Sequence, residues 1–267
     1  EKEIPNKWDI FRQPSGRSPD AENADHLRSD YYDTDGLSEE YIRVMIDGEY
    51  GYDQSGLPVF NKVFLPQWHV TKEPLRISPS SESPLVIGMD AGLTPAAVIG
   101  QQDYRGRLLV VGECYTNPDE SMGMERFVTT RLLPYLRTHF PLAGKAYVTA
   151  DPAINHRSQA NEVTAFDVLS RYFHVAVAWS DKLPARISAA ESWLAGQIDG
   201  KPKVIFDPRT SRLQKAMAHG YRYAKKRNTG GVNDEIKDTP DKNHPDSDLV
   251  DSLMYLCMHA SGGNSQA

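Results

Sequence analysis

Four aspartates lie at positions where an ionised side chain needs a partner. Asp90 ends the apolar run "PLVIGMD", and Asp151 ends a second apolar run, "KAYVTAD". Asp248 and Asp251 lie three residues apart in "HPDSDLVDSLMYL", where Asp251 interrupts an otherwise apolar segment. Burying a carboxylate is costly unless it is paired or binds a metal. These four residues are therefore the first candidates for chemistry.

A divalent cation is the partner that would suit all four carboxylates. If Asp90 and Asp151 end adjacent strands of one sheet, their carboxylates repel each other and resist ionisation unless a cation sits between them. Asp248 and Asp251 are spaced to project from one face of a helix. Hard oxygen ligands of this kind suit Mg²⁺ or Mn²⁺. The pattern predicts a metal site.

Each aspartate also has an ordinary structural interpretation. An Asp that follows a strand is often a turn residue or a helix cap, and this applies to Asp90 and to Asp151. Asp248 is also explained as a solvated acid in a first helical turn, where the helix dipole favours anions. Asp251 is the hardest to explain without a partner. The metal interpretation depends on the combination of the acids in this order on these elements.

The elements that must position these acids follow a mixed pattern. Three apolar runs separated by short turns, at 84–90, 96–102 and 107–115, predict an antiparallel meander. Strand-like segments at 145–151, 173–179 and 202–208 then alternate with helical segments at 124–140, 160–172, 184–198, 211–223 and 247–260. A strand–helix–strand crossover implies parallel pairing. The expected fold is α/β, a mixed sheet with helices on both faces.

Composition divides the chain into unequal parts. Residues 1–83 are rich in Pro, Gly, Ser and Asp, end in the linker-like "SPSSESP", and are expected to be an appendage. Residues 84–262 carry the regular pattern and are the expected main domain, followed by a disordered tail at 263–267. The chain begins without Met, so we expect a fragment of a longer protein.

Overall charge and composition exclude several classes. The net charge of −6 excludes a uniformly basic nucleic-acid binder. The two cysteines, Cys114 and Cys257, lie far apart and form neither a disulfide framework nor a zinc knuckle. No apolar run approaches the roughly 18 residues of a membrane span.

One local stretch is basic enough to contact phosphates. It covers 208–228, and its cations are Arg209, Arg212, Lys215, Arg222, Lys225, Lys226 and Arg227. Clustered cations bind a nucleic-acid backbone in a salt-dependent way, so this stretch is the candidate DNA-binding surface. A solvated helix face is the alternative. The following segment, with Gly230 and Gly231, predicts a hairpin tip beside it.

The motifs together resemble a known family. The segments "PLVIGMDAGLTPAAVIGQ", "AYVTADPA" and "KNHPDSDLVDSLMYLC" resemble the RuvC-like branch of the RNase H-like nuclease superfamily. More closely, they resemble the C-terminal nuclease domain of the tailed-bacteriophage terminase large subunit, and "GEYGYDQSGLPVFNKVF" resembles the stretch that precedes it. The resemblance implies that Asp90, Asp151 and Asp251 are the metal-binding catalytic acids. Asp248 stands where many members have His, so its role stays open.

The resemblance also implies an activity. It would be a metal-dependent endonuclease that cuts concatemeric double-stranded viral DNA during genome packaging, using two Mg²⁺ or Mn²⁺ ions. Asp90 would bridge the ions, Asp151 would hold one, and Asp251, with or without Asp248, the other. The family also has an ATPase motor, but no phosphate-binding GxxxxGK[ST] loop is present in this sequence. The resemblance therefore implies that residues 1–83 are only the tail of that ATPase domain plus a linker.

The implied setting follows from the same family. Partners would be double-stranded DNA, the portal protein, the small terminase subunit and the ATPase domain of the same polypeptide. The location would be the cytoplasm of the infected bacterial host, not the mature virion. Alternatives are a non-catalytic portal or DNA docking module and a Holliday-junction or transposase-type nuclease. An actin-like ATPase also opens with Asp-x-Gly, but the second glycine-rich loop it needs is missing around Asp151.

Overall fold

The structure is a computed structural model of the 267-residue chain. It describes residues 57–79, 83–144, 146–155, 163–225 and 236–262, together with Pro14 and Ser18. The predicted hairpin tip, Lys226 and Arg227 lie outside the described residues, and of Lys225 only the backbone is described.

The centre of the fold is a mixed sheet of six strands in the order β5-β4-β1-β2-β3-β8. The strands are β1 (Val86–Asp90), β2 (Ala96–Gln102), β3 (Leu108–Tyr115), β4 (Tyr147–Ala150), β5 (His174–Val177) and β8 (Val204–Phe206). β1, β2 and β3 form the predicted antiparallel meander. β4 pairs parallel with both β1 and β5, and β8 pairs parallel with β3. The predicted mixed sheet is confirmed.

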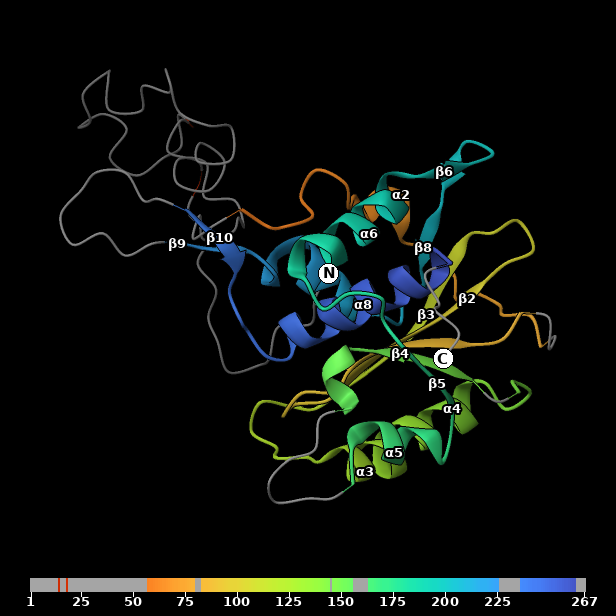
Figure 1. The fold of residues 1–267 in the computed structure, drawn as a ribbon. Coiled ribbons are helices and arrows are strands. Elements are labelled where there is room, and N and C mark those ends of the chain that lie inside the picture. Colours follow the sequence, from red (N-terminus) through yellow and green to blue (C-terminus); the bar gives the residue numbers. More distant parts are fainter. Residues whose placement is uncertain are drawn as a thin grey trace. The chain divides into compact units, whose positions relative to one another are not determined.

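Helices cover both faces of this sheet, as Figure 1 shows. One face carries α8 (Asp246–Ala260), with α6 (Leu183–Ala195) and α7 (Ser211–Lys215) packed around it. The other carries α3 (Met124–Phe127), α4 (Leu133–His139) and α5 (Ala165–Ser170). Alternate strand residues serve the two cores: Val98 of β2 faces the α8 side and Ile99 the opposite side.

Two of the predicted helices are not regular α-helices throughout. The segment expected at 124–140 runs through a π-helical part, Val128–Leu132, between α3 and α4. The segment expected at 211–223 continues from α7 into a π-helical part, Ala216–Gly220, and then ends. Tyr223–Lys225 instead forms strand β9, which pairs antiparallel with β10 (Ile236–Pro240). These two strands are the arms of the predicted hairpin.

Smaller elements complete the described part of the chain. They are helix α2 (Pro66–His69), the 3₁₀ turn Pro152–Asn155 and the strand pair β6 (Gln197–Ile198) and β7 (Lys201–Pro202). No helix among the described residues is long and apolar enough to cross a membrane.

The compact unit that contains the sheet begins at Gly56, before the boundary expected between residues 83 and 84. Phe60 and Phe64 are buried in the same core as α8 and β8. The Phe64 ring contacts the Phe206 ring edge-on at 5.2 Å between centroids. Residues 57–79 therefore pack as part of this unit, because their few apolar side chains fill the core beside β8. The other compact unit, Glu1–Ser55, lies almost wholly outside the described residues.

Candidate active site

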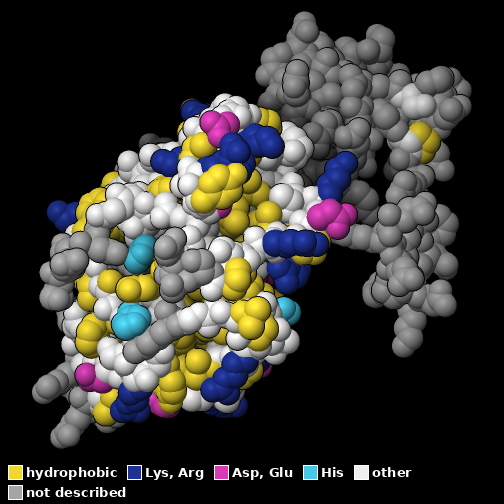
Figure 2. Space-filling model, turned by 90° about the vertical axis from the view of Figure 1, so that its right-hand side faces the viewer, with side chains coloured by type: hydrophobic (Ala, Val, Ile, Leu, Met, Phe, Trp, Pro, Cys, Tyr) yellow, Lys and Arg dark blue, Asp and Glu magenta, His cyan; other side chains and the backbone are white. Residues whose placement is uncertain are grey.

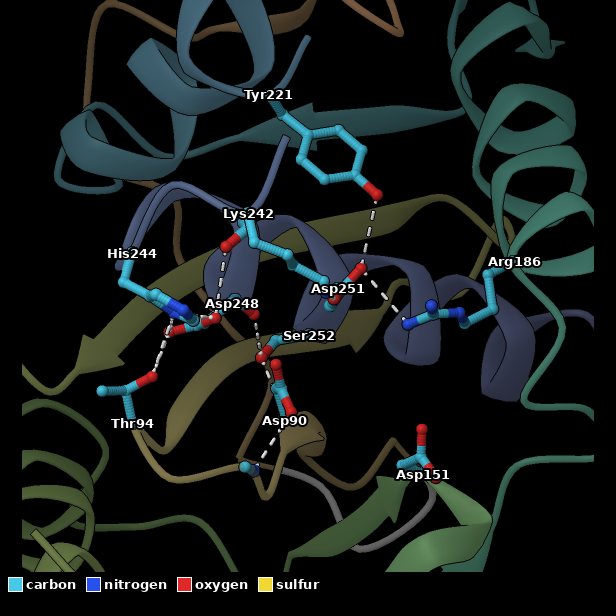
Figure 3. A network of polar contacts seen from close by, with 12 residues as sticks. Asp90, Thr94, Asp151, Arg186, Tyr221, Lys242, His244, Asp248, Asp251 and Ser252 are labelled. Atoms are coloured by element: carbon cyan, nitrogen blue, oxygen red, sulfur yellow. Dashed lines mark hydrogen bonds and ion pairs between the residues drawn. The ribbon is translucent and has the colours of Figure 1, made fainter. Parts of the chain in front are cut away.

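Parallel pairing of β1 with β4 brings two of the predicted acids to one edge of the sheet. Met89 pairs with Ala150, so Asp90 and Asp151, the next residue of each segment, leave neighbouring strands at the same end. Figure 3 shows both side chains below α8, with Asp248 and Asp251 above them. The four acids that the sequence singled out therefore gather around one location.

Close contact between α8 and the sheet sets the distance between the acids of α8 and those at the sheet edge. A Cβ atom on Gly88 would lie 1.9 Å from the carbonyl oxygen of Ser252, so only glycine permits this approach. The Asp90 backbone N–H donates to Ser252 Oγ at 3.0 Å, and Ser252 Oγ lies 2.9 Å from the carbonyl oxygen of Ala96. α8 is thus fastened to the β1–β2 hairpin beside Asp90.

Asp251 is buried and neutralised by two cations. Lys242 Nζ lies 2.6 Å from Asp251 Oδ2, and Arg186 Nη1 lies 3.2 Å from Asp251 Oδ1. The Tyr221 hydroxyl lies 3.5 Å from the same Oδ1. Pairing therefore explains how an aspartate is accommodated in this apolar helix.

Asp248 and Asp151 each have different partners. His244 Nδ1 lies 2.7 Å from Asp248 Oδ1, and the Thr94 hydroxyl donates to Asp248 Oδ2 at 2.7 Å. Asp151 accepts from the Tyr255 hydroxyl at 2.5 Å and from the Ala153 backbone N–H at 2.6 Å. These acids are held in place by neutral or titratable donors.

Asp90 is the least compensated of the four. Within the described residues, its carboxylate accepts a single hydrogen bond, from the backbone N–H of Gly92 at 3.1 Å. Desolvation by the surrounding protein, followed by the negative charges of Asp251 and Asp248, raises the pKa of Asp90 to about 7. Lys242 and the Gly92 N–H act in the opposite direction and only partly offset this. The pKa of Asp90 is thus close to neutral pH, and Asp251 and Asp248 are the negative charges near it.

The donor set suits a divalent cation in its chemistry. Carboxylate oxygens are the ligands that Mg²⁺ and Mn²⁺ prefer, and a cation near Asp90 would stabilise the carboxylate form that burial and the charges of Asp251 and Asp248 disfavour. As the side chains lie, however, no group of three or more His, Cys, Asp or Glu in the described part of the chain is arranged to hold a metal ion. Three of the four carboxylates face protein partners instead. Metal binding would require at least one of these contacts to open.

Several residues of this network could not be recognised from the sequence. Arg186, Lys242 and Tyr255 contact the acids directly but were not singled out, and His244 was not linked to Asp248. Two spacings carried a weak signal: His244 and Asp248, and Asp251 and Tyr255, are each four residues apart.

The predicted basic surface is divided among different roles. Arg209 forms two hydrogen bonds of 2.8 Å to the fully buried Asp207, and Arg212 Nε lies 2.6 Å from Asp246 Oδ1. These two arginines therefore neutralise internal acids, whereas Lys215 is exposed. On the face drawn in Figure 2, Lys and Arg side chains form several separate groups among hydrophobic ones. DNA binding by the stretch 208–228 stays a prediction.

Solved structures share this arrangement of strands and helices. The large terminase of a thermophilic bacteriophage, in complex with ATP-γ-S, matches 76% of this chain with a TM-score of 0.52 and 15% identity. This chain shares its fold with phage large terminases. The match covers 45% of that terminase, and a second crystal form of the same protein matches 87% of this chain and 51% of that one, with a TM-score of 0.50 and 14% identity. The chain thus spans about half the length of these terminases.

The predicted α/β fold, a mixed sheet with helices on both faces, is confirmed by the strand order of the sheet. The nuclease domain of the P22 large terminase also aligns, over 77% of this chain and 93% of that one, with a TM-score of 0.48 and 11% identity. No protein-family model and no curated protein sequence matches this chain.

Proposed function

We propose that this chain is a metal-dependent DNA endonuclease that cuts concatemeric double-stranded viral DNA during genome packaging. One observation carries the proposal: Asp90, Asp151, Asp248 and Asp251 gather at one edge of an RNase H-like sheet, in a fold shared with phage large terminases. The raised pKa of Asp90 supports it, because a site of mutually repelling carboxylates is stabilised by an added cation.

Asp90, Asp151 and Asp251 are the proposed metal-binding residues, with Asp248 as a further candidate. Two Mg²⁺ or Mn²⁺ ions held there would supply water activation and charge stabilisation for phosphodiester hydrolysis. Asp90 lies between the end of β4 and the acids of α8, so it is the proposed shared ligand.

The chain's own groups supply the rest of the chemistry. Lys242 is an exposed cation of the network, paired with Asp251, and its positive charge would attract a DNA phosphate to this site. Ser252 holds the Asp90 backbone, so the carboxylate stays at the end of β1. His244 and Thr94 hold both oxygens of Asp248. Each contact restricts how far a carboxylate can turn.

The proposed partners follow from the same assignment. Double-stranded DNA is the substrate, and the portal protein, the small terminase subunit and an ATPase domain of the same polypeptide are the proposed assembly partners. Such an enzyme would act in the cytoplasm of the infected host.

The test is cleavage of supercoiled plasmid by the purified chain with Mg²⁺ or Mn²⁺. The expected result is nicking and linearisation that EDTA abolishes and that Asp90→Asn abolishes as well. Asp199→Asn is the matched control, because Asp199 is an exposed aspartate that pairs with Arg105 and not with any of the four acids. The Asp199→Asn variant should cut DNA like the wild type. A folded wild-type chain that cuts with neither metal would contradict the proposal. Cleavage that survives in Asp90→Asn would contradict the assignment of Asp90 to the active site.

A further inference from the structure

A largely enclosed arginine contacts one of the acids directly and reaches a second through Tyr255. Arg186 Nη1, from α6, lies 3.2 Å from Asp251 Oδ1 and donates to the Tyr255 hydroxyl oxygen at 3.1 Å. The Tyr255 hydroxyl in turn donates to Asp151 Oδ2 at 2.5 Å. The bridge therefore runs from Asp251 on α8, through Arg186 and Tyr255, to Asp151 at the end of β4. Figure 3 shows the Arg186 guanidinium directed at Asp251 from the side of α6.

Packing holds this arginine in place. Its side chain is 12% exposed, and its guanidinium carbon lies 5.3 Å from the centroid of the Tyr255 ring. Arg186 precedes Ala190 by one helical turn, and Ala190 is fully buried against α8, so the arginine lies on the packed face of α6. A cation so enclosed has little freedom to leave its carboxylate.

Lys242 provides the contrast on the same carboxylate. It contacts the other oxygen, Asp251 Oδ2, and its side chain is 61% exposed. An exposed lysine can return to water at little cost, whereas withdrawing Arg186 would leave a buried charge unpaired. The two oxygens of Asp251 therefore differ: Oδ1 has a fixed partner and Oδ2 has a replaceable one.

An ion pair that merely joins α6 to α8 is the plain alternative. That role requires one contact between the two helices. Arg186 instead contacts both Asp251 and Tyr255, whose hydroxyl holds Asp151, so its position affects two proposed metal-binding residues at once. Outer-shell partners of this kind orient ligands, and their loss typically weakens metal binding about 10- to 100-fold.

We propose that Arg186 is a positioning residue that, together with Tyr255, orients the carboxylates of Asp251 and Asp151 for cation binding. Asp251 keeps Oδ1 on Arg186 and offers Oδ2, the oxygen now on Lys242. Asp151 is held through Oδ2 by Tyr255. The inference rests on the proposed metal-dependent function and deepens it.

The experiment is calorimetric titration of the chain with Mn²⁺ alone, in the wild type, Arg186→Met and Tyr255→Phe. We expect both variants to bind Mn²⁺ about 10-fold more weakly. Arg131→Met is the matched control, because Arg131 pairs with Glu120 at the surface, and its Mn²⁺ affinity should be unchanged. Urea unfolding of each variant separates loss of stability from loss of binding. Tyr255→Phe keeps the ring and the net charge, so it tests the bridge even if Arg186→Met fails to fold.

Three outcomes would overturn the inference. Tighter Mn²⁺ binding by Arg186→Met would mean that the arginine only competes with the cation. Unchanged Mn²⁺ affinity in Tyr255→Phe, with or without lower stability, would mean that the bridge is structural and would leave the proposed nuclease intact. A wild-type chain that binds no Mn²⁺ would remove the proposed metal site and this inference with it.

Discussion

The Tyr255 hydroxyl donates a 2.5 Å hydrogen bond to the carboxylate of Asp151, which ties the end of β4 to the middle of α8. Tyr255 lies one helical turn after Asp251, so a single face of α8 both carries one acid of the candidate site and holds another. The site is therefore organised from the helix as much as from the sheet edge.

Asp90 should make folding stability depend on pH. Its pKa is about 7 in the folded chain and near 3.8 without the fold, so the folded state holds the extra proton between these values. Stability contributed by this group falls as pH rises toward 7 and stays lower above it. Asp90→Asn removes the cost of burying the charged carboxylate and its repulsion by Asp251 and Asp248, so without metal we expect it to be more stable than the wild type at pH 8 by about 2 kcal/mol, allowing for partial solvent screening.

Thermal unfolding in EDTA at pH 4 and pH 8 measures this effect. The wild type and Asp90→Asn should differ little in stability at pH 4. Asp199→Asn, at an exposed position, should show no pH-dependent gain. An Asp90→Asn protein that is no more stable than the wild type at pH 8 would mean that burial and the neighbouring negative charges do not raise the pKa of Asp90.

Lys242 should compete with a cation for Asp251. Lys242→Met removes the positive charge 2.6 Å from Asp251 Oδ2 and leaves the Arg186 contact in place. We expect Mn²⁺ to bind several-fold more tightly in titration calorimetry, because one competitor is gone. Lys62→Met, at an exposed lysine, is the control. Weaker binding in Lys242→Met would show that the lysine assists the site instead.

Gly88→Ala should unfold or strongly weaken the domain. Its new Cβ would meet the Ser252 carbonyl oxygen at 1.9 Å and the Leu256 backbone nitrogen at 2.6 Å, and neither backbone atom can give way without moving α8. We expect a loss of about 3 kcal/mol or more in urea unfolding. Gly144→Ala, where a Cβ meets nothing within 4 Å, should change little. Equal stability of the two variants would contradict the close approach of α8.

Single substitutions in the predicted DNA-binding stretch 208–228 should affect DNA binding at some of its cations and stability at others. Lys215→Ala should weaken duplex binding in fluorescence anisotropy and reduce its salt dependence, because this lysine is exposed. Arg209→Ala should mainly lower stability, by about 1 kcal/mol, because it removes the partly exposed ion-pair partner of the buried Asp207, which keeps its backbone hydrogen bonds. The prediction for the stretch fails if Lys215→Ala leaves both the affinity and the salt slope unchanged.

The sequence predicted the sheet and the gathering of the acids because both depend on local pattern and simple topology. Alternating and apolar runs marked the strands, and Asp90 and Asp151 each end such a run, so pairing of the two strands brings them to one edge. The partners of the acids were not predictable in this way. Arg186 meets Asp251 only because α6 packs on α8, and no periodicity in either segment encodes that contact.

Composition did not separate core from surface residues at other positions. Residues 57–79 were expected to be part of an appendage, yet Phe60 and Phe64 lie in the core. Trp179 is 51% exposed, whereas Trp193 is buried. Single apolar residues carry too little pattern to separate core from surface, because that distinction depends on which elements lie over them.

The order of the acids along the chain has a consequence for biosynthesis. Asp90 and Asp151 emerge from the ribosome early, but Asp251 belongs to α8, the final described element, and α8 also supplies Tyr255 and Ser252 to the other two acids. A nascent chain that has completed the meander and β4 still lacks the helix that closes the site. The acids therefore come together only once α8 has been translated and docked, so incomplete chains should lack the proposed nuclease activity.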